Sequence, residues 1–288
     1  MFKPHYFIRL AVLLLTIGFL ASCNRKDEVQ PANEQDFVSA RATVDLIAEL
    51  NAVNEMSMSF SQTDNKSERL ASGRVSALRE TTCGAVTDVT DESTGTQTFT
   101  VDFGKGTTCE DKVLRKGKII FTVLLDSMSF SEDNNFYMGV SSGAQFVGYE
   151  ADGKKLEGSH SIKMVFTNKS LKYDIQFKNG VLAYEDGSKV QWNSTYAIQG
   201  SYNAQNPEAA IKLSMTGGLA GTDRKGKIFS ADITSPLLID SSCQYSVTGG
   251  KYLIASQGYS ALYDFGNGEC DAITTLTING KTEQIALK

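Results

Sequence analysis

The stretch LKYDIQFKNGVLAYEDGSKVQWNSTYAIQG, residues 171–200, decides the fold class. Polar and apolar residues alternate through much of it, which is typical of β-strands with one buried face. Asn179-Gly180 and Asp186-Gly187 interrupt the alternation, and such pairs supply the positive φ angles that tight hairpin turns need. The stretch therefore predicts antiparallel strands joined by short turns.

The same pattern continues on both sides of this stretch. Strand-like runs include TQTFTVDF at 96–103 and KGKIIFTVLLD at 116–126. Further turn signals lie at Asp152-Gly153, Gly217-Gly218, Gly249-Gly250 and Asn279-Gly280. About 13 strands are expected, too many for one open twisted sheet that neither curls nor splits. We therefore predict an all-β fold, an antiparallel sandwich or a partly closed barrel of about 13 strands, over residues 80–288.

The start of the chain has a different character. Residues 1–22 have the composition of an export signal, since Lys3 and Arg9 precede an apolar run from Leu10 to Leu20. This run is short for a membrane-spanning helix, which needs about 20 residues. Residues 23–35 are polar and charged, and they predict a flexible tether.

One amphipathic helix is predicted within residues 36–60. Apolar residues recur there at helical spacing, at Val38, Ala42, Ile47, Leu50 and Val53. We expect this helix to pack on the β domain or at its edge.

Cys23 stands where the export signal ends. Leu20-Ala21-Ser22-Cys23 resembles the lipobox of bacterial lipoproteins. In that class the peptide is cut before the cysteine, whose thiol takes a lipid, so the resemblance implies a palmitate-bearing Cys23 and a membrane as partner. An ordinary export signal with an incidental cysteine is the alternative.

The other four cysteines form an even set, which in an exported protein favours two disulfides. The separation is 26 residues from Cys83 to Cys109 and 27 from Cys243 to Cys270. An Asp-Phe-Gly-x-Gly motif precedes the second cysteine of each pair. We therefore favour this local pairing among the three connectivities, and the repeated motif suggests two related β modules. A zinc site is disfavoured because no Cys-x-x-Cys occurs, and no cofactor is expected.

These motifs together resemble a broad group of Bacteroidota-type lipoproteins whose activity is not settled. The shared features are the lipobox, Thr82-Cys83, the loop from Asp102 to Cys109, Leu156-Glu157-Gly158 and the ending Asn279-Gly280-Lys281. In such bacteria a basic residue followed by acids after the lipidated cysteine resembles a signal for surface display, and Lys26-Asp27-Glu28 fits it. The resemblance implies an outer-membrane lipoprotein on the cell surface, with the periplasmic face as the alternative.

The second Asp-Phe-Gly-x-Gly loop carries several oxygen ligands. Asp264, Asn267 and Asp271 are residue types that Ca²⁺ takes from a loop. A glycine turn held by a disulfide, with its acids in solvent, explains the same residues, and we favour that interpretation.

Catalytic arrangements are hard to find in this sequence. Gly139–Gly143 matches the Gly-x-Ser-x-Gly pattern of hydrolases, but the residues that follow favour a strand where that motif needs a helix. His160 would be the base for Ser141, and a lone histidine in a strand is more often exposed or hydrogen-bonded. Trp192, Tyr184 and Tyr196 could stack on sugars, although packing within the sheet is the more common role of strand aromatics.

Charge narrows the range of partners. The chain has 28 basic and 33 acidic residues, and loss of Lys3 and Arg9 with the export signal leaves 26 basic residues and a net charge near −7. An acidic chain without a basic stripe is a poor nucleic-acid binder. We expect a lipid-anchored cell-envelope protein with a non-enzymatic binding or structural role, whose partner is a glycan or an envelope protein. The alternative is a glycan-directed hydrolase using unidentified carboxylates.

Overall fold

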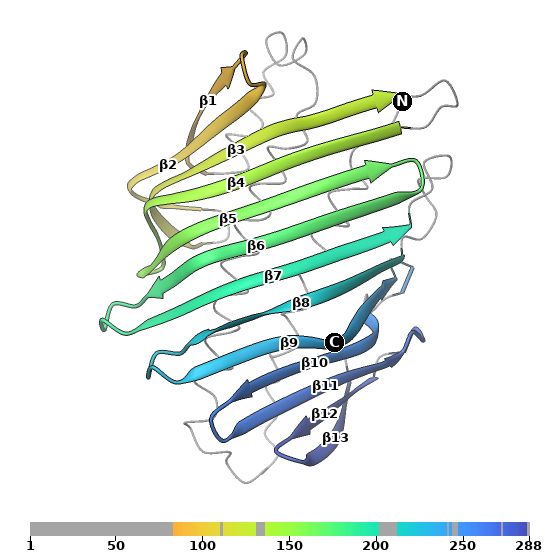
Figure 1. Cartoon of the computed structure of the whole chain (residues 1–288). Coiled ribbons are helices and arrows are strands. Elements are labelled where there is room, and N and C mark those ends of the chain that lie inside the picture. The colour runs from red at the N-terminus through yellow and green to blue at the C-terminus, as the bar shows by residue number, and fades with distance from the viewer. Residues whose placement is uncertain are drawn as a thin grey trace.

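The structure, a computed structural model, describes residues 83–109, 112–130, 136–201, 212–240, 242–243, 247–271 and 273–286. Thirteen strands occupy most of them (Figure 1). They are β1 (Ala85–Asp91), β2 (Thr96–Thr108), β3 (Leu114–Phe130), β4 (Phe136–Ala151), β5 (Lys154–Thr167), β6 (Ser170–Ala183), β7 (Lys189–Ser201), β8 (Lys212–Thr222), β9 (Ile228–Asp240), β10 (Val247–Ser256), β11 (Tyr259–Asn267), β12 (Ile273–Ile278) and β13 (Lys281–Ala286).

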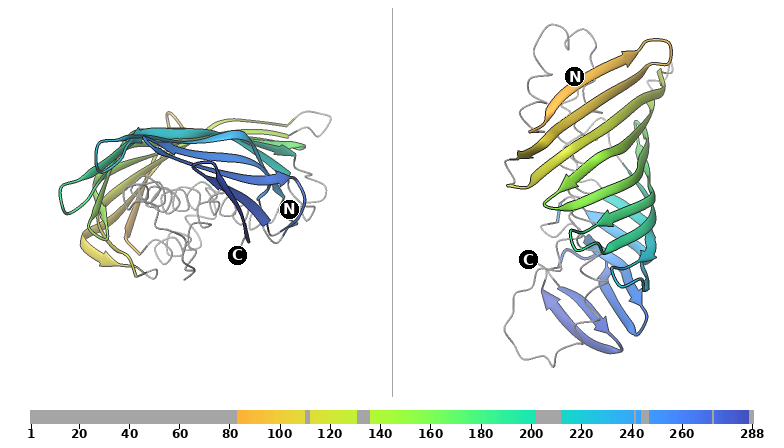
Figure 2. Two further views of the ribbon diagram at one scale, coloured as in Figure 1. Left: turned by 90° about the horizontal axis from the view of Figure 1, so that it is seen from below. Right: turned by 90° about the vertical axis from the view of Figure 1, so that its left-hand side faces the viewer.

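All thirteen strands belong to one antiparallel sheet, in which each strand pairs with the next one along the chain. Figure 2 shows that the sheet curves strongly, and it is not closed because β1 and β13 lie at its two ends. The predicted all-β class, antiparallel pairing and strand number are confirmed. The single curved sheet is nearer to the partly closed barrel than to the sandwich that we also considered.

The predictions for the N-terminal part of the chain concern residues that the structure does not describe. The export signal 1–22, the tether 23–35 and the helix within 36–60 all lie outside the described residues. Among the residues that are described, no helix has the length and apolar character needed to span a membrane.

Only half of the six predicted hairpin signals form hairpin turns. Asp152-Gly153, Asp186-Gly187 and Asn279-Gly280 lie in the turns that follow β4, β6 and β12. The other three pairs lie inside strands, next to register shifts: Asn179-Gly180 in β6, Gly217-Gly218 in β8 and Gly249-Gly250 in β10. The hairpin prediction is therefore wrong at these three pairs. A β-bulge uses the same positive φ angles as a tight turn, and it increases the local twist of the sheet.

One face of the sheet is buried and the other is exposed. In β7, the buried residues Val190, Trp192 and Ser194 alternate with the exposed residues Gln191 and Asn193. Successive side chains of a strand point to opposite faces, so this alternation assigns each residue to a face. The buried residues fall in two apolar clusters, which share Val123, Tyr252 and Tyr263 as partly buried neighbours and so form one layer.

The buried face is the concave one, because its side chains meet across intervening strands. Tyr196 of β7 forms a side-chain hydrogen bond with Tyr252 of β10, over β8 and β9. Neighbouring strands lie about 4.8 Å apart, so these two residues would be about 14 Å apart along a flat sheet. Side chains converge across such a span where the sheet curves toward them.

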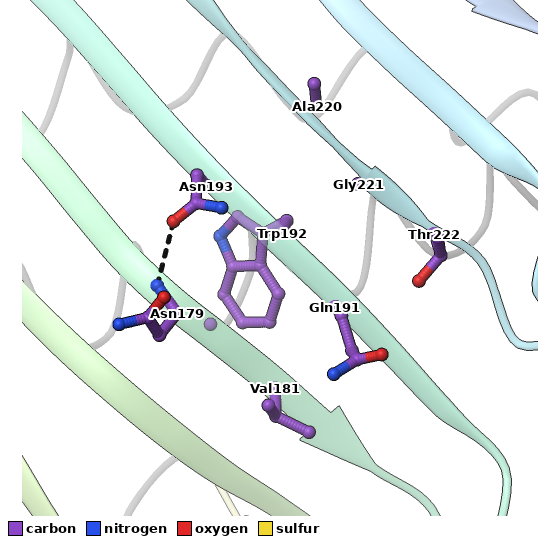
Figure 3. Close-up of a pocket in the computed structure, with 9 residues that line it drawn as sticks. Asn179, Val181, Gln191, Trp192, Asn193, Ala220, Gly221 and Thr222 are labelled. Carbon is purple, nitrogen blue, oxygen red and sulfur yellow. Dashed lines mark hydrogen bonds between the residues drawn. The ribbon is translucent and has the colours of Figure 1, made fainter.

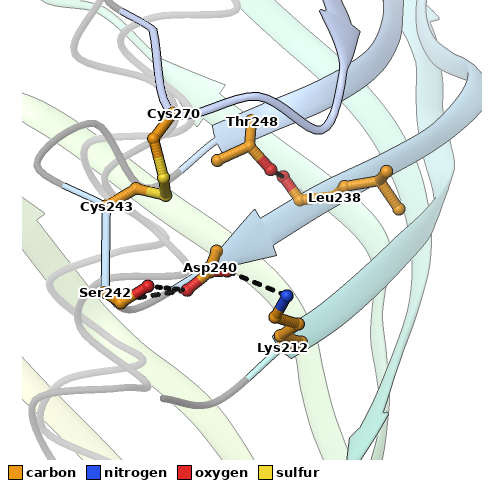
Figure 4. The surroundings of a disulfide bond; sticks show 7 residues. All are labelled: Lys212, Leu238, Asp240, Ser242, Cys243, Thr248 and Cys270. Atoms are coloured by element: carbon orange, nitrogen blue, oxygen red, sulfur yellow. Dashed lines mark hydrogen bonds and ion pairs between the residues drawn. A yellow bond between two sulfur atoms is a disulfide. The ribbon is translucent and has the colours of Figure 1, made fainter.

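The two disulfides form as predicted, Cys83 with Cys109 and Cys243 with Cys270. Their Cα–Cα distances are 5.3 and 5.5 Å, within the usual range for disulfides. The first closes the β1–β2 hairpin, and the second links the β9–β10 connection to the end of β11 (Figure 4). Asp240 supports the second link, since its carboxylate accepts hydrogen bonds from the backbone N–H and hydroxyl of Ser242.

The two Asp-Phe-Gly-x-Gly motifs adopt the same local structure at opposite ends of the sheet. In the first, Asp102 Oδ1 accepts a hydrogen bond from the backbone N–H of Gly104, and Asp102 Oδ2 pairs with Lys118 Nζ at 2.8 Å. Phe103 between them is buried and Gly104 has a φ of 60°. The aspartate therefore holds a left-handed glycine turn beyond the buried ring.

The second motif repeats each of these features. Asp264 Oδ1 accepts from the backbone N–H of Gly266, Asp264 Oδ2 pairs with Lys251 Nζ at 2.9 Å, and Phe265 is buried. Gly266 has a φ of 82°. The recurrence in the sequence thus corresponds to a recurrence of structure, within one continuous sheet.

Candidate functional site

A chain of aromatic rings crosses the concave face from β2 to β7, and we call it the aromatic row. It consists of Phe103, Tyr149, Phe146, Phe177 and Trp192. Ring-centroid distances along the row are 5.8, 5.9, 5.9 and 4.9 Å in that order. Rings at such distances interact favourably, and together they form a continuous apolar surface.

Two glycines make room for the row. A Cβ atom on Gly158 would lie 2.6 Å from Phe177 Cε1, and one on Gly180 would lie 2.5 Å from Trp192 Cε2. Both distances are shorter than any tolerable contact between carbon atoms. The Phe177 and Trp192 rings can therefore lie flat against the sheet only because these two positions lack side chains.

Unpartnered polar atoms border the row at Phe177. The ring of His160 lies 6.0 Å from that of Phe177, and His160 is 3% exposed. Neither imidazole nitrogen of His160 has a hydrogen-bond partner, and nor does the indole nitrogen of Trp192. Burial without a partner lowers the pKa of His160 from 6.5 to about 4, so the imidazole is neutral at pH 7. The prediction that this histidine is exposed or hydrogen-bonded is therefore wrong.

The aromatic row and the unpartnered atoms beside it can make two kinds of contact, apolar contact and hydrogen bonds. Aromatic rings offer contact to an apolar body, while the Trp192 indole N–H donates and a neutral imidazole both donates and accepts. Buried polar groups in proteins normally have partners, and those that lack one suggest a missing ligand or water. The concave face therefore combines an apolar surface with polar atoms that could hydrogen-bond to one oxygen atom.

The burial of His160 predicts a specific dependence of stability on pH. Its pKa is depressed in the folded state, so its contribution is complete above pH 6.5 and is lost as the pH falls toward 4. We expect the free energy of unfolding to drop by about 2 kcal/mol between pH 7 and pH 5. Urea unfolding at several pH values measures it, and His160→Phe should remove most of the drop. An equal drop in that variant would contradict the assignment.

The weighed Ser141–His160 pair does not form. Ala144 pairs with His160 across β4 and β5, so Ser141, three residues away, points to the opposite, convex face. Its hydroxyl donates a 2.6 Å hydrogen bond to Asp126 Oδ2. A nucleophile and its base must be within hydrogen-bond reach, and here the sheet separates them.

Two of the three weak calcium candidates, Asp264 and Asp271, already have protein partners for their carboxylates. Asp264 bonds to Gly266 and Lys251 as described, and Asp271 Oδ1 accepts a hydrogen bond from the backbone N–H of Ile273. Asn267 ends β11, in register with Gly249. Within the described parts of the chain, no three acidic, histidine or cysteine residues gather as metal ligands do.

A shallow pocket of about 330 Å³ opens on the convex face (Figure 3). Exposed amides of Asn179, Gln191 and Asn193 border it, and the backbone N–H of Asn179 donates to Asn193 Oδ1. The other lining residues are Gly180, Val181, Trp192, Ala220, Gly221 and Thr222. Trp192 is only 2% exposed, so the pocket lacks an exposed aromatic platform for a sugar.

The three aromatics considered for sugar stacking are engaged in the protein. Trp192 belongs to the aromatic row, Tyr196 bonds to Tyr252, and Tyr184 lies 4.0 Å under the guanidinium of Arg224. Packing was the preferred interpretation of these residues, and it is confirmed.

Among the described residues, the carboxylates that pair with basic side chains do not have the environment of a general acid for glycoside hydrolysis. Seven described carboxylates each pair with a lysine or arginine. Hydrogen bonds lower the pKa of several aspartates; at Asp102 and Asp264 the lysine partner is the main cause, ahead of a backbone N–H. A general acid for this reaction needs a raised pKa.

Comparison with known proteins finds no match, whether to a protein-family model, a curated protein sequence or a solved structure. The interpretation of the concave face as a functional site therefore depends on the geometry described above. Cys23, the predicted lipidation site, lies outside the described residues.

Proposed function

We propose that this protein is a lipid-anchored protein of the bacterial outer membrane, displayed at the cell surface, with a non-enzymatic binding role. The periplasmic face of the same membrane is the alternative location. The lipobox-like Leu20–Cys23 and the charged residues that follow it support the anchor and its location. The two disulfides agree with an oxidising compartment.

The binding role rests on one observation: unpartnered, buried polar atoms of His160 and Trp192 flank the aromatic row on the concave face. Leaving a buried polar group without a partner costs about 1–3 kcal/mol, and a ligand oxygen would recover part of this. Two such groups beside one ring favour a binding surface over a purely structural layer. The ligand class that fits is an elongated apolar molecule bearing a carbonyl, carboxyl or hydroxyl oxygen.

A fluorescence titration tests the binding role directly. Trp192 is the only tryptophan, so all indole emission reports on the concave face. Stearic acid brominated in mid-chain should quench this emission saturably, because bromine quenches indoles at contact distance. Stearic acid without bromine should compete and relieve the quenching.

Matched variants sharpen this titration. His160→Phe keeps the shape of the site and removes one hydrogen-bonding partner, so binding should weaken about fivefold to tenfold, as expected for one hydrogen bond. Gln176→Ala on the convex face should leave binding unchanged. Absence of quenching up to the solubility limit of the brominated acid would overturn the binding proposal.

The anchor has its own test. Cys23→Ala removes the thiol that accepts the lipid, so the protein should move from the membrane fraction to the soluble fraction. Fractionation with immunodetection measures this, and the double variant Cys83→Ser with Cys109→Ser is the control that keeps the lipobox and leaves no free thiol. A Cys23→Ala protein that stays with the membrane would show that the anchor lies elsewhere.

A further inference from the structure

The concave face is buried although the described strands form a single layer. Phe121 and Ile119 of β3 and Leu182 of β6 each have 0% exposure. Curvature alone narrows a trough without sealing it, and an open single sheet leaves one side to solvent unless something covers it. The described residues contain neither a second sheet nor a helix that could do so.

We propose that residues 36–60 cover the concave face, with their apolar stripe against the aromatic row and its neighbours. The stripe residues Ile47, Leu50 and Val53 match a face built from aromatic and aliphatic side chains. An amphipathic helix buries such a stripe against another element, and the concave face is the apolar surface that the sheet offers. When bound, the proposed ligand would lie in the same trough between this helix and the sheet, so the two proposals do not exclude each other, and this inference does not require the ligand.

The length of the predicted helix and the length of the segment that joins it to the sheet both allow this placement. A helix over residues 36–56 would be about 31 Å long. The following residues, 57–82, can span up to about 85 Å when extended, so the connection does not restrict where the helix lies. The segment ends at Cys83, which the disulfide holds at the β1–β2 hairpin, one end of the trough.

A photo-crosslinking experiment with the full mature chain tests the placement. Benzoylphenylalanine at Leu50 should crosslink within the chain to concave-face residues such as Phe121, Ala144 or Ile162. Residue-level mass spectrometry distinguishes the faces, because concave and convex residues alternate along each strand. Ala48, about 200° away around a helix, is the matched control and should give at least tenfold fewer of these crosslinks.

Trp192 supplies a second measurement in the same chain. Leu50→Asp should shift its emission to the red and raise its quenching by acrylamide at least twofold, while Ala48→Asp should change neither. Crosslinks from Leu50 to convex residues, crosslinks between two chains, or no crosslink to the concave face would each overturn the proposal. Failure of fatty-acid binding would leave these crosslinks unaffected, so the two proposals fail separately.

Discussion

Phe177→Ala will lower the free energy of unfolding by about 3–5 kcal/mol, as expected for loss of a fully buried phenylalanine ring. Phe177 is 1% exposed and contacts Phe146, Trp192 and His160. The cavity cannot collapse easily, because the ring lies against Gly158, which has no side chain to move into the space. Stability is a small difference between large terms, so a loss of this size is a large fraction of the total.

Urea unfolding followed by far-ultraviolet circular dichroism is the suitable measurement, since Phe177 touches the only tryptophan and its loss would change the fluorescence signal itself. Gln176→Ala, one residue away on the convex face, should change the free energy of unfolding by less than about 0.5 kcal/mol. Equal effects of the two substitutions would refute the assignment of Phe177 to a buried concave layer.

Removing either disulfide will cost about 3.5 kcal/mol, because the closed loops of 26 and 27 residues restrict the unfolded chain almost equally. The variants replace both partners, Cys83→Ser with Cys109→Ser in one protein and Cys243→Ser with Cys270→Ser in the other. Each pair removes the link without leaving a free thiol to form a wrong one. Urea unfolding of both variants beside the parent measures the two costs.

The comparison between the two variants is the control. Loop length predicts costs within a few tenths of a kcal/mol of each other, so a much larger cost at one end would show that its disulfide acts mainly through the native state. Costs below about 1 kcal/mol at both ends would contradict the loop-closure argument altogether.

The fold was largely predictable because its signals are local. Alternation along 171–200 predicts strands with one buried face, and turn residues such as Asp186-Gly187 predict where the chain reverses. The pairs Asn179-Gly180 and Gly249-Gly250 misled because a bulge and a turn need the same backbone angles. Only the residues on the partner strand decide between the two, and a single sequence does not contain that relation.

The candidate site was much less predictable. Alternation places Trp192 and Phe177 on one face, but contacts between strands that are not neighbours depend on how far the sheet curves. His160 has no sequence signal that distinguishes a buried, unpartnered imidazole from an exposed one. Gly158 and Gly180 were the available hints, since glycine inside a strand often marks the close approach of another group.

The order of the strands has a consequence for how the protein folds. Each strand pairs only with its neighbours in sequence, so the sheet resembles a one-dimensional array to which hairpins can be added one after another. Such an array opens most readily from its ends, where a terminal strand has one partner. The disulfide at β1–β2 and the one beside β10–β11 close hairpins near the two ends, and they would hinder unzipping from either direction.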